Sequence, residues 1–315
     1  MTKKMEKVNM QQVKELRERT QAGLNDCRSA LVEAGGDMEK AVEVILKRGL
    51  AKSAKRAGAV TTEGVVVARV SDDSKSGVLV EVNIQTDFAA RNEDFLSFAA
   101  RVTEVASKSK ASPGADLGAE AYPGGSGTVE QTRQALVAKL GENITVRRWS
   151  RLSVEGSGRV HAYVHMGGKV GALVSLSTGT EEAAATPELD KFADDVAMQI
   201  TAMDPRYLGA EDVPAEDKRK QSEIFDAQLA EEGKPEKVRA KIVEGKLAKW
   251  LKEVCLLEQQ SVLETEKTVG KLVTELSAKL GTSVHLVDFV RYQRGEGIDS
   301  AGADFAAEVA KLAGG

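Results

Sequence analysis

The chain has 315 residues, of which 42% are apolar and 29% charged, and its formal net charge is −4. This length predicts two or more domains, and this composition is typical of a soluble globular protein and excludes a disordered one. The apolar runs are too short to span a membrane, and the first residues lack the apolar core of a secretory signal. Two cysteines far apart in the sequence exclude a disulfide framework. We therefore expect a cytoplasmic protein.

The first 57 residues form the predicted head, which is basic and helical. Through Ala57 the chain carries 13 Lys and Arg against 8 Asp and Glu, a local charge of +5. Apolar residues recur at helical spacing in three stretches, which are 10–20, 24–34 and 37–49. We expect a three-helix bundle of the ubiquitin-associated type, a docking domain, followed by a basic linker at 51–58. The charge alone fits an acidic partner and a solvated helical surface equally well.

From Gly64 the apolar period becomes that of strands, and an internal repeat begins. "GVVVARV" (64–70), "GVLVEV" (77–82) and "FAARV" (98–102) recur as "GRVHAYV", "GALVSL" and "FADDV", each 94 residues later. Each copy predicts two antiparallel strands and then a helix. The predicted fold class is therefore α+β, with a core of two related subdomains that carry helices on one face of their strands.

The remaining segments complete a predicted division into five parts. Residues 107–127 are rich in Gly, Ala, Ser and Pro and indicate a mobile loop or linker. Two amphipathic stretches around "GKP" indicate an antiparallel helical hairpin inserted in the second subdomain. The predicted boundaries are 1–57 for the head and linker, 58–152 for the first subdomain, 153–214 with 259–299 for the second, 215–258 for the hairpin, and 300–315 for a C-terminal helix.

No pattern for catalysis or for a cofactor is present in the sequence. "HMGGKVGALV" (165–174) has Gly and Lys, but Val170 follows Lys169 where a phosphate-binding loop needs Ser or Thr, so a tight hairpin turn is the better interpretation. His161 and His165 lie four apart on a strand, about 13 Å, too far to share a metal. Aromatic residues, at 4%, do not interleave with basic ones. We expect no enzyme activity, no cofactor, no metal, no direct nucleotide binding and no nucleic-acid partner.

Several stretches resemble the bacterial elongation factor Ts family, in family order and over nearly the whole chain. They are "VKELRERTQAGLNDCRSAL", "GGDMEKAVEVILKRG", "EVNIQTDFAARNEDF", "VAKLGENITVRRW", "YVHMGGKVGALV", "GKPEKVRAKIVEGK" and "FVRYQRGEGI". Gln21 departs from the family's usual Gly, and the 107–127 loop is longer than in compact members. The resemblance implies a guanine-nucleotide exchange factor that acts on elongation factor Tu. It also implies a docking head, a core of two subdomains, a helical hairpin and a C-terminal module.

The resemblance assigns a role to the corner formed by Thr86, Asp87, Phe88 and Ala89, between a predicted strand and a predicted helix. In the family, this corner enters the nucleotide domain of the partner, where Phe88 would wedge between helices and Asp87 would disturb the Mg²⁺ site. From the residues alone, Asp87 as a helix N-cap and Phe88 as a hydrophobic staple is the favoured interpretation. The second copy of the repeat reads "TEE" (180–182) at this corner, so the repeated fold needs no Phe there.

Further partner contacts are implied by the resemblance alone. Lys14 and Arg17 would dock the head on the partner, Leu140 and Gly141 would touch the nucleotide domain near the corner, and His165 would reach the phosphate side. Each also has a plain structural interpretation, as a solvated charge, a helix end or a turn residue. An alternative function is a protein-binding adaptor that does not alter its ligand.

Overall fold

The computed structural model describes residues 8–20, 22–125 and 127–299, which form two compact units. Among these residues, unit 1 comprises 8–67, 80–149 and 293–299, and unit 2 comprises 68–79 and 150–292. Each unit combines helices with strands, so the predicted α+β class is confirmed. The division into five parts stays a prediction, and the predicted C-terminal helix at 300–315 lies outside the described residues.

The head forms a three-helix bundle within unit 1. Its helices are α1 (Met10–Thr20), α2 (Leu24–Glu33) and α3 (Met38–Arg56). Leu16, Cys27 and Leu31 are fully buried between them, as the helical spacing predicts. Asp37 caps α3 by accepting a hydrogen bond from the backbone N–H of Lys40. Because α3 runs to Arg56, the linker expected at 51–58 is wrong over most of its length.

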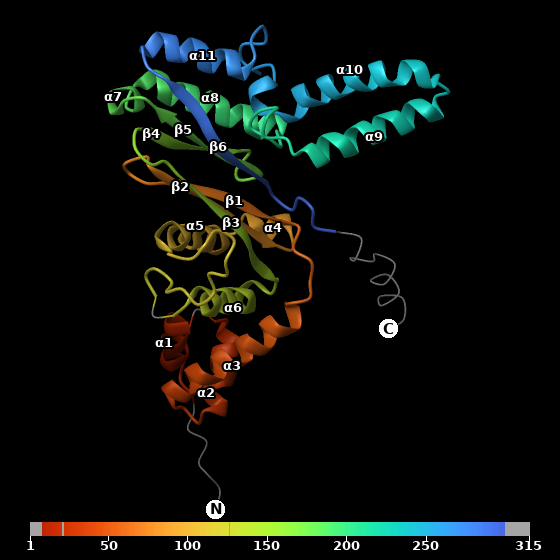
Figure 1. Ribbon diagram of the computed structural model, residues 1–315. Coiled ribbons are helices and arrows are strands. Elements are labelled where there is room, and N and C mark those ends of the chain that lie inside the picture. Colours follow the sequence, from red (N-terminus) through yellow and green to blue (C-terminus); the bar gives the residue numbers. More distant parts are fainter. Residues whose placement is uncertain (1–7, 21, 126, 300–315) are drawn as a thin grey trace, which may run out of the picture. The chain divides into compact units, whose positions relative to one another are not determined.

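A three-stranded sheet, most of whose residues belong to unit 1, and three helices follow the head (Figure 1). The strands, in sheet order, are β1 (Glu63–Val70), β2 (Ser76–Ile84) and β3 (Ile144–Ser153). The helices are α4 (Asp87–Ala90), α5 (Glu93–Lys108) and α6 (Val129–Leu140). Phe95 and Phe98 on α5 are almost fully buried, which fixes this helix in the core of the unit. α6 ends at Gly141, whose positive φ of 79° is easily adopted only by glycine.

Unit 2 repeats this arrangement around a second three-stranded sheet. Its strands, in sheet order, are β4 (Gly158–His165), β5 (Val170–Thr178) and β6 (Val284–Gln293). Its helices are α7 (Glu181–Ala184), α8 (Pro187–Met203), the short 3₁₀ helix η1 (Leu256–Glu258) and α11 (Val269–Leu280). β4 and β5 pair antiparallel, from Gly158 opposite Ser177 to His165 opposite Val170.

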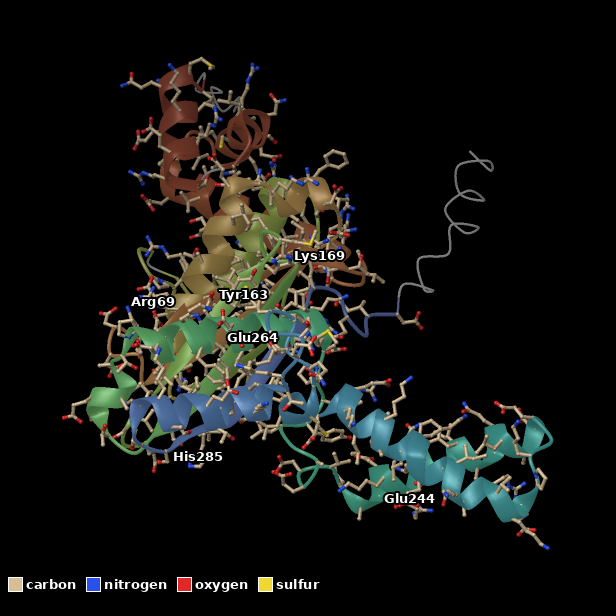
Figure 2. All side chains as sticks on the ribbon, turned by 90° about the horizontal axis from the view of Figure 1, so that it is seen from above. Arg69, Tyr163, Lys169, Glu244, Glu264 and His285 are labelled. Carbon is tan, nitrogen blue, oxygen red and sulfur yellow. The ribbon has the colours of Figure 1, made fainter. Side chains whose placement is uncertain are left out.

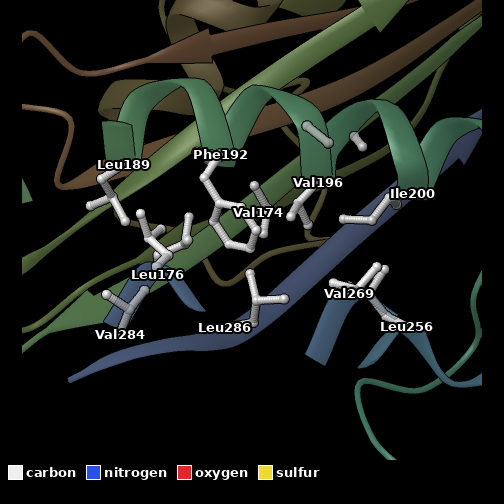
Figure 3. Packing of buried hydrophobic residues seen from close by; sticks show 14 residues of the cluster. Val174, Leu176, Leu189, Phe192, Val196, Ile200, Leu256, Val269, Val284 and Leu286 are labelled. Atoms are coloured by element: carbon white, nitrogen blue, oxygen red, sulfur yellow. The ribbon is translucent and has the colours of Figure 1, made fainter. Parts of the chain in front are cut away.

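The core of unit 2 lies between its sheet and α8 (Figure 3). One stripe of α8 carries Leu189, Phe192, Val196 and Ile200, at the spacing of a single helical face. Figure 3 shows this stripe facing the side chains of β5 and β6, with Val269 and Leu256 closing the cluster. Burial of these side chains gives the hydrophobic stabilisation of the unit.

The internal repeat is confirmed, and it is longer than the sequence showed. α7 begins 181−87 = 94 residues after α4, and α8 begins 187−93 = 94 residues after α5, the offset already seen for the strands. α11 begins 269−129 = 140 residues after α6, and β6 begins 284−144 = 140 residues after β3. The offset grows by 140−94 = 46 residues because the helical hairpin is inserted between α8 and α11.

The inserted hairpin is the predicted pair of helices, α9 (Ala215–Glu231) and α10 (Glu236–Val254), joined through Gly233. Figures 1 and 2 show the two helices side by side, with Glu244 labelled on α10 in Figure 2. The base of the hairpin is fixed by an aromatic and apolar cluster. The Tyr207 ring meets the Trp250 ring edge-on, with centroids 6.4 Å apart, and Val254 and Cys255 are buried beside them.

Within the segment 107–127, residues 109–125 pack against the rest of unit 1, which differs from the mobile linker expected. The ring of Tyr122 stacks on that of Phe98, with centroids 5.9 Å apart. The indole N–H of Trp149 donates to the backbone carbonyl of Ala115 at 2.8 Å. These two contacts hold the segment to α5 and β3.

A buried carboxylate joins three parts of unit 1. Glu81 on β2 is fully buried and accepts hydrogen bonds from the side chains of Arg147, Arg148 and Asn83 and from the N–H of Gly295. Burial alone would raise the pKa of Glu81, but these donors, the Gly295 N–H first among them, together hold it below its usual value. The pairing therefore fastens the segment that follows β6 to the sheet.

We predict that Glu81→Gln destabilises the protein by about 3 kcal/mol at pH 7, because it leaves two arginines facing a neutral amide. A carboxyl whose folded pKa is lowered contributes stability above its unfolded pKa of about 4.3 and loses it as pH falls through the folded pKa. The difference between wild type and variant, measured by urea unfolding, should therefore shrink below about pH 4. A difference that stays constant from pH 7 to pH 3 would contradict this assignment.

We predict that most of the hairpin can be removed without loss of the fold. Replacing residues 219–249 by a short Gly/Ser loop keeps Tyr207 and Trp250 and so leaves the base cluster intact. The variant should unfold cooperatively in a thermal melt followed by circular dichroism, at nearly the wild-type midpoint. Extending the deletion to include Trp250 is the matched control and should lower the midpoint. Loss of the cooperative transition in the shorter deletion would show that the whole hairpin belongs to the core.

Candidate functional site

The corner Thr86–Ala89 is a short, capped helical turn at the end of β2. Thr86 has an extended backbone, and its hydroxyl oxygen accepts the N–H of Ala89 at 3.3 Å. Thr86 is therefore the N-cap, and the prediction that Asp87 fills this role is wrong. Asp87 instead pairs with Arg91 at 3.3 Å, where both side chains are exposed, so the pair contributes little.

Phe88 is the most exposed apolar side chain of the corner. Its side chain is 83% exposed, whereas Phe95 and Phe98 on the following helix are 0% and 2% exposed. The hydrophobic staple expected from the residues alone is wrong, because an exposed ring cannot hold a helix by packing. A ring that leaves its apolar area in water has not realised about 1.5–3 kcal/mol of burial energy. That energy is available to a partner.

A second corner, at the end of α6, is fastened to the first. The carboxylate of Glu142 accepts two hydrogen bonds from Thr86, one from its N–H at 3.0 Å and one from its hydroxyl at 2.7 Å. Beside it, the side-chain oxygen of Gln85 accepts the N–H of Asn143 at 2.7 Å. The half-buried Leu140 and the exposed Gly141 directly precede Glu142 in the chain, at the end of α6.

Sequence reasoning missed Gln85 and Glu142 as parts of this site. Both lie inside stretches that resemble the family, but neither falls on an apolar period or in a capping pattern. Their partners are 58 and 56 residues away in the chain. The only available signal was that both stretches stand at predicted element ends, where polar side chains often bond to backbone groups.

The repeat supplies a matched corner in unit 2. Thr180 has the same extended backbone as Thr86 and caps α7 by accepting the N–H of Ala183 at 3.2 Å. The residue at the place of Phe88 is Glu182, as 88+94 = 182, and it is exposed. The fold therefore builds this turn without an aromatic ring, which confirms the prediction drawn from "TEE".

Lys14 and Arg17 lie on the exposed face of α1 in the head. Val13 and Leu16, on the opposite face, are buried in the bundle. Within the described part of the chain, neither basic side chain has an ion pair. Their charges are therefore free to meet an acidic surface.

His165 belongs to unit 2, at the end of β4. Its Nδ1 lies 2.9 Å from the hydroxyl of Tyr163, and the two rings stack with centroids 5.8 Å apart. Met166, which follows it with a positive φ of 48°, is 68% exposed. The strand register confirms that "HMGGKV" is a hairpin turn and not a phosphate-binding loop; Figure 2 labels Tyr163 on β4 and Lys169 in the turn.

Over residues 8–20, 22–125 and 127–299 no group of three or more His, Cys, Asp or Glu could hold a metal ion. His161 instead pairs with Asp194 at 3.1 Å and lies 3.6 Å from Asp190. In the same ranges, no helix is both long and apolar enough to cross a membrane.

Comparison with known proteins identifies the family. The family described as elongation factor TS matches residues 85–296. Elongation factor Ts of Clostridium perfringens is 47% identical over 302 residues, which are 96% of this chain and 98% of that protein. Elongation factor Ts of Symbiobacterium thermophilum is 44% identical over 310 residues, or 98% and 99% of the two chains.

The chain belongs to the elongation factor Ts family. It is therefore a translation elongation factor. The matched range begins at Gln85, so it includes the corner Thr86–Ala89, the end of α6 and His165, whereas Lys14 and Arg17 precede it. The resemblance stated from the sequence is confirmed, and the roles of single residues stay predictions.

We predict that Phe88→Ala leaves the stability of the free protein within about 0.5 kcal/mol of wild type, because the ring is exposed. Phe95→Ala is the matched control, one helix further along the chain, and should cost about 3–5 kcal/mol. Urea unfolding of both variants tests this. A large loss of stability in Phe88→Ala would restore the staple interpretation.

Proposed function

We propose that this protein is a guanine-nucleotide exchange factor for elongation factor Tu. The observation that carries the proposal is the exposure of Phe88 on a corner that is fastened by hydrogen bonds. Family membership supports it, and so does the matched corner of unit 2, which has Glu182 in the same place. A partner that buries this ring would gain the hydrophobic energy that the free protein leaves unrealised.

In the proposed mechanism, the corner enters the nucleotide domain of the partner. Phe88 wedges between helices there, and its burial contributes about 1.5–3 kcal/mol to the complex. Asp87, weakly paired with Arg91, disturbs the groups around the Mg²⁺ ion held by the partner. That ion neutralises the phosphates of GDP, so its loss weakens GDP binding. By linkage, GDP weakens the binding of this protein to the same extent.

The other predicted contacts fit docking on the same partner. Leu140 and Gly141 adjoin the corner and would touch the nucleotide domain beside it. Lys14 and Arg17 would attract an acidic surface to the head, more strongly at low salt. His165 would reach the partner from the β4–β5 turn. The helical hairpin and the C-terminal module would add accessory contacts.

In this proposal the protein performs no chemical step of its own. It binds no nucleotide directly and needs no cofactor, and the only metal involved is the Mg²⁺ of the partner. A cytoplasmic location, where translation takes place, goes with the proposal.

We predict that Phe88→Ala slows GDP release by about 10–100-fold, because the lost burial energy corresponds to that factor. The measurement is stopped-flow release of a fluorescent GDP from elongation factor Tu. Asp87→Ala should act more weakly, and its defect should shrink when Mg²⁺ is already chelated. Leu263→Ala, which removes an apolar side chain 54% exposed in unit 2, is the control and should release GDP at the wild-type rate.

Normal exchange by a stably folded Phe88→Ala variant would refute the wedge mechanism. If wild-type protein binds elongation factor Tu but leaves the rate of GDP release unchanged, the protein is an adaptor instead. These two outcomes are separated because the first concerns the variant and the second the wild type.

A further inference from the structure

We infer that Glu142 is a positioning residue, which holds Phe88 at the angle needed for nucleotide exchange. The inference rests on the proposed function and adds to it a residue outside the corner. Glu142 stands in the turn between α6 and β3 and reaches the corner with its side chain alone.

The carboxylate of Glu142 fixes both polar groups of the N-cap residue. One oxygen accepts the N–H of Thr86 at 3.0 Å, and the other accepts its hydroxyl at 2.7 Å. Because the hydroxyl proton points to Glu142, a lone pair of the same oxygen is left facing the N–H of Ala89. Charge-assisted bonds of this length are the stronger kind. Glu142 thus fixes the side-chain rotamer of Thr86. Thr86 in turn fixes the first turn of α4 by accepting the N–H of Ala89.

Few other contacts hold the orientation of this corner. α4 has only four residues, and a single helical turn is unfavourable without tertiary contacts. Phe88 contributes no packing, since its side chain is 83% exposed. The ion pair of Asp87 with Arg91 lies in water and contributes little. Only Ala90, 7% exposed, is buried on this helix.

The backbone next to Glu142 is itself held by hydrogen bonds. The next residue, Asn143, is 5% exposed, and its N–H donates to the side chain of Gln85 at 2.7 Å. Its side-chain amide donates to the carbonyl of Ala59 at 2.9 Å. The backbone that carries Glu142 is therefore held on two sides, so its carboxylate can restrain the corner.

The matched corner of unit 2 shows that the fold does not need this carboxylate. Thr180 caps α7 as Thr86 caps α4, but the residue at the place of Glu142 is Thr282, as 142+140 = 282. Thr282 carries one hydroxyl oxygen and no carboxylate, so it cannot bind the N–H and the hydroxyl of the cap residue through two separate charged oxygens as Glu142 does. The carboxylate is present at the corner that exposes a ring and absent at the one that does not. We conclude that the carboxylate of Glu142 orients the ring of Phe88.

Glu142→Ala tests the inference in the same GDP-release assay with the full chain. The maximal release rate should fall about tenfold, the factor for losing one strong hydrogen bond, while the half-saturating concentration changes less than twofold. The melting temperature should stay close to that of wild type. Glu182→Ala, an exposed glutamate on the short helix of the matched corner, should behave as wild type.

A double variant distinguishes positioning from direct contact. If Glu142 acts through the ring, then Phe88→Ala with Glu142→Ala should be no slower than Phe88→Ala alone. Thr86→Val, which keeps the shape but removes the hydroxyl, should reproduce the defect of Glu142→Ala. Thr86→Ser should recover most of the rate lost in Thr86→Val. If Glu142→Ala does not fold, the Thr86 pair decides the question.

Three results would overturn the inference. Normal exchange by Glu142→Ala beside defective Phe88→Ala would remove the role of Glu142 and leave the proposed function standing. Defects that multiply in the double variant would show that Glu142 contacts the partner directly. Normal exchange by both single variants would refute the proposed function itself.

Discussion

An apolar ring that stands in water must be held by contacts other than its own burial. Phe88 faces this constraint, being 83% exposed on a helix of four residues. Its orientation depends on the hydrogen bonds between Thr86 and Glu142, with Gln85 and Asn143 beside them. Because these bonds join the segment after β2 to the turn after α6, the geometry of the corner depends on how these two parts of unit 1 are held together.

The duplicated fold supplies this scaffold and a comparison for it. Both copies place a threonine-capped turn after the second strand. At this corner the first copy has an exposed ring, Phe88, and the carboxylate of Glu142 bonded to the cap residue, whereas the second copy has Glu182 and Thr282 in these places. The second copy accommodates the inserted hairpin instead, between α8 and α11. The two copies thus share a fold but differ at this corner, and a difference that the fold does not require points to function.

The elements of the fold were largely predictable because they follow local rules. The glycine end of α6 and the "GKP" turn depend on residues close together in the chain, and the 94-residue offset follows from comparing short stretches of sequence. The contacts of single side chains were not predictable. Glu142 meets Thr86 across 56 residues, and Glu81 meets Gly295 across 214. The exposure of Phe88 was not predicted because the residue pattern did not reveal the four-residue helix α4. With Thr86 as N-cap, Phe88 lies inside this helix and not at the position before the cap that a staple requires.

The most direct test of this account is the solvent exposure of the Phe88 ring before and after binding. 4-Fluorophenylalanine at residue 88 gives a ¹⁹F signal whose broadening by a dissolved paramagnetic agent reports access to water. The account predicts strong broadening in the free protein and protection in the complex with nucleotide-free elongation factor Tu. Equal broadening in the two states would contradict it, because the ring would then remain in water while GDP leaves.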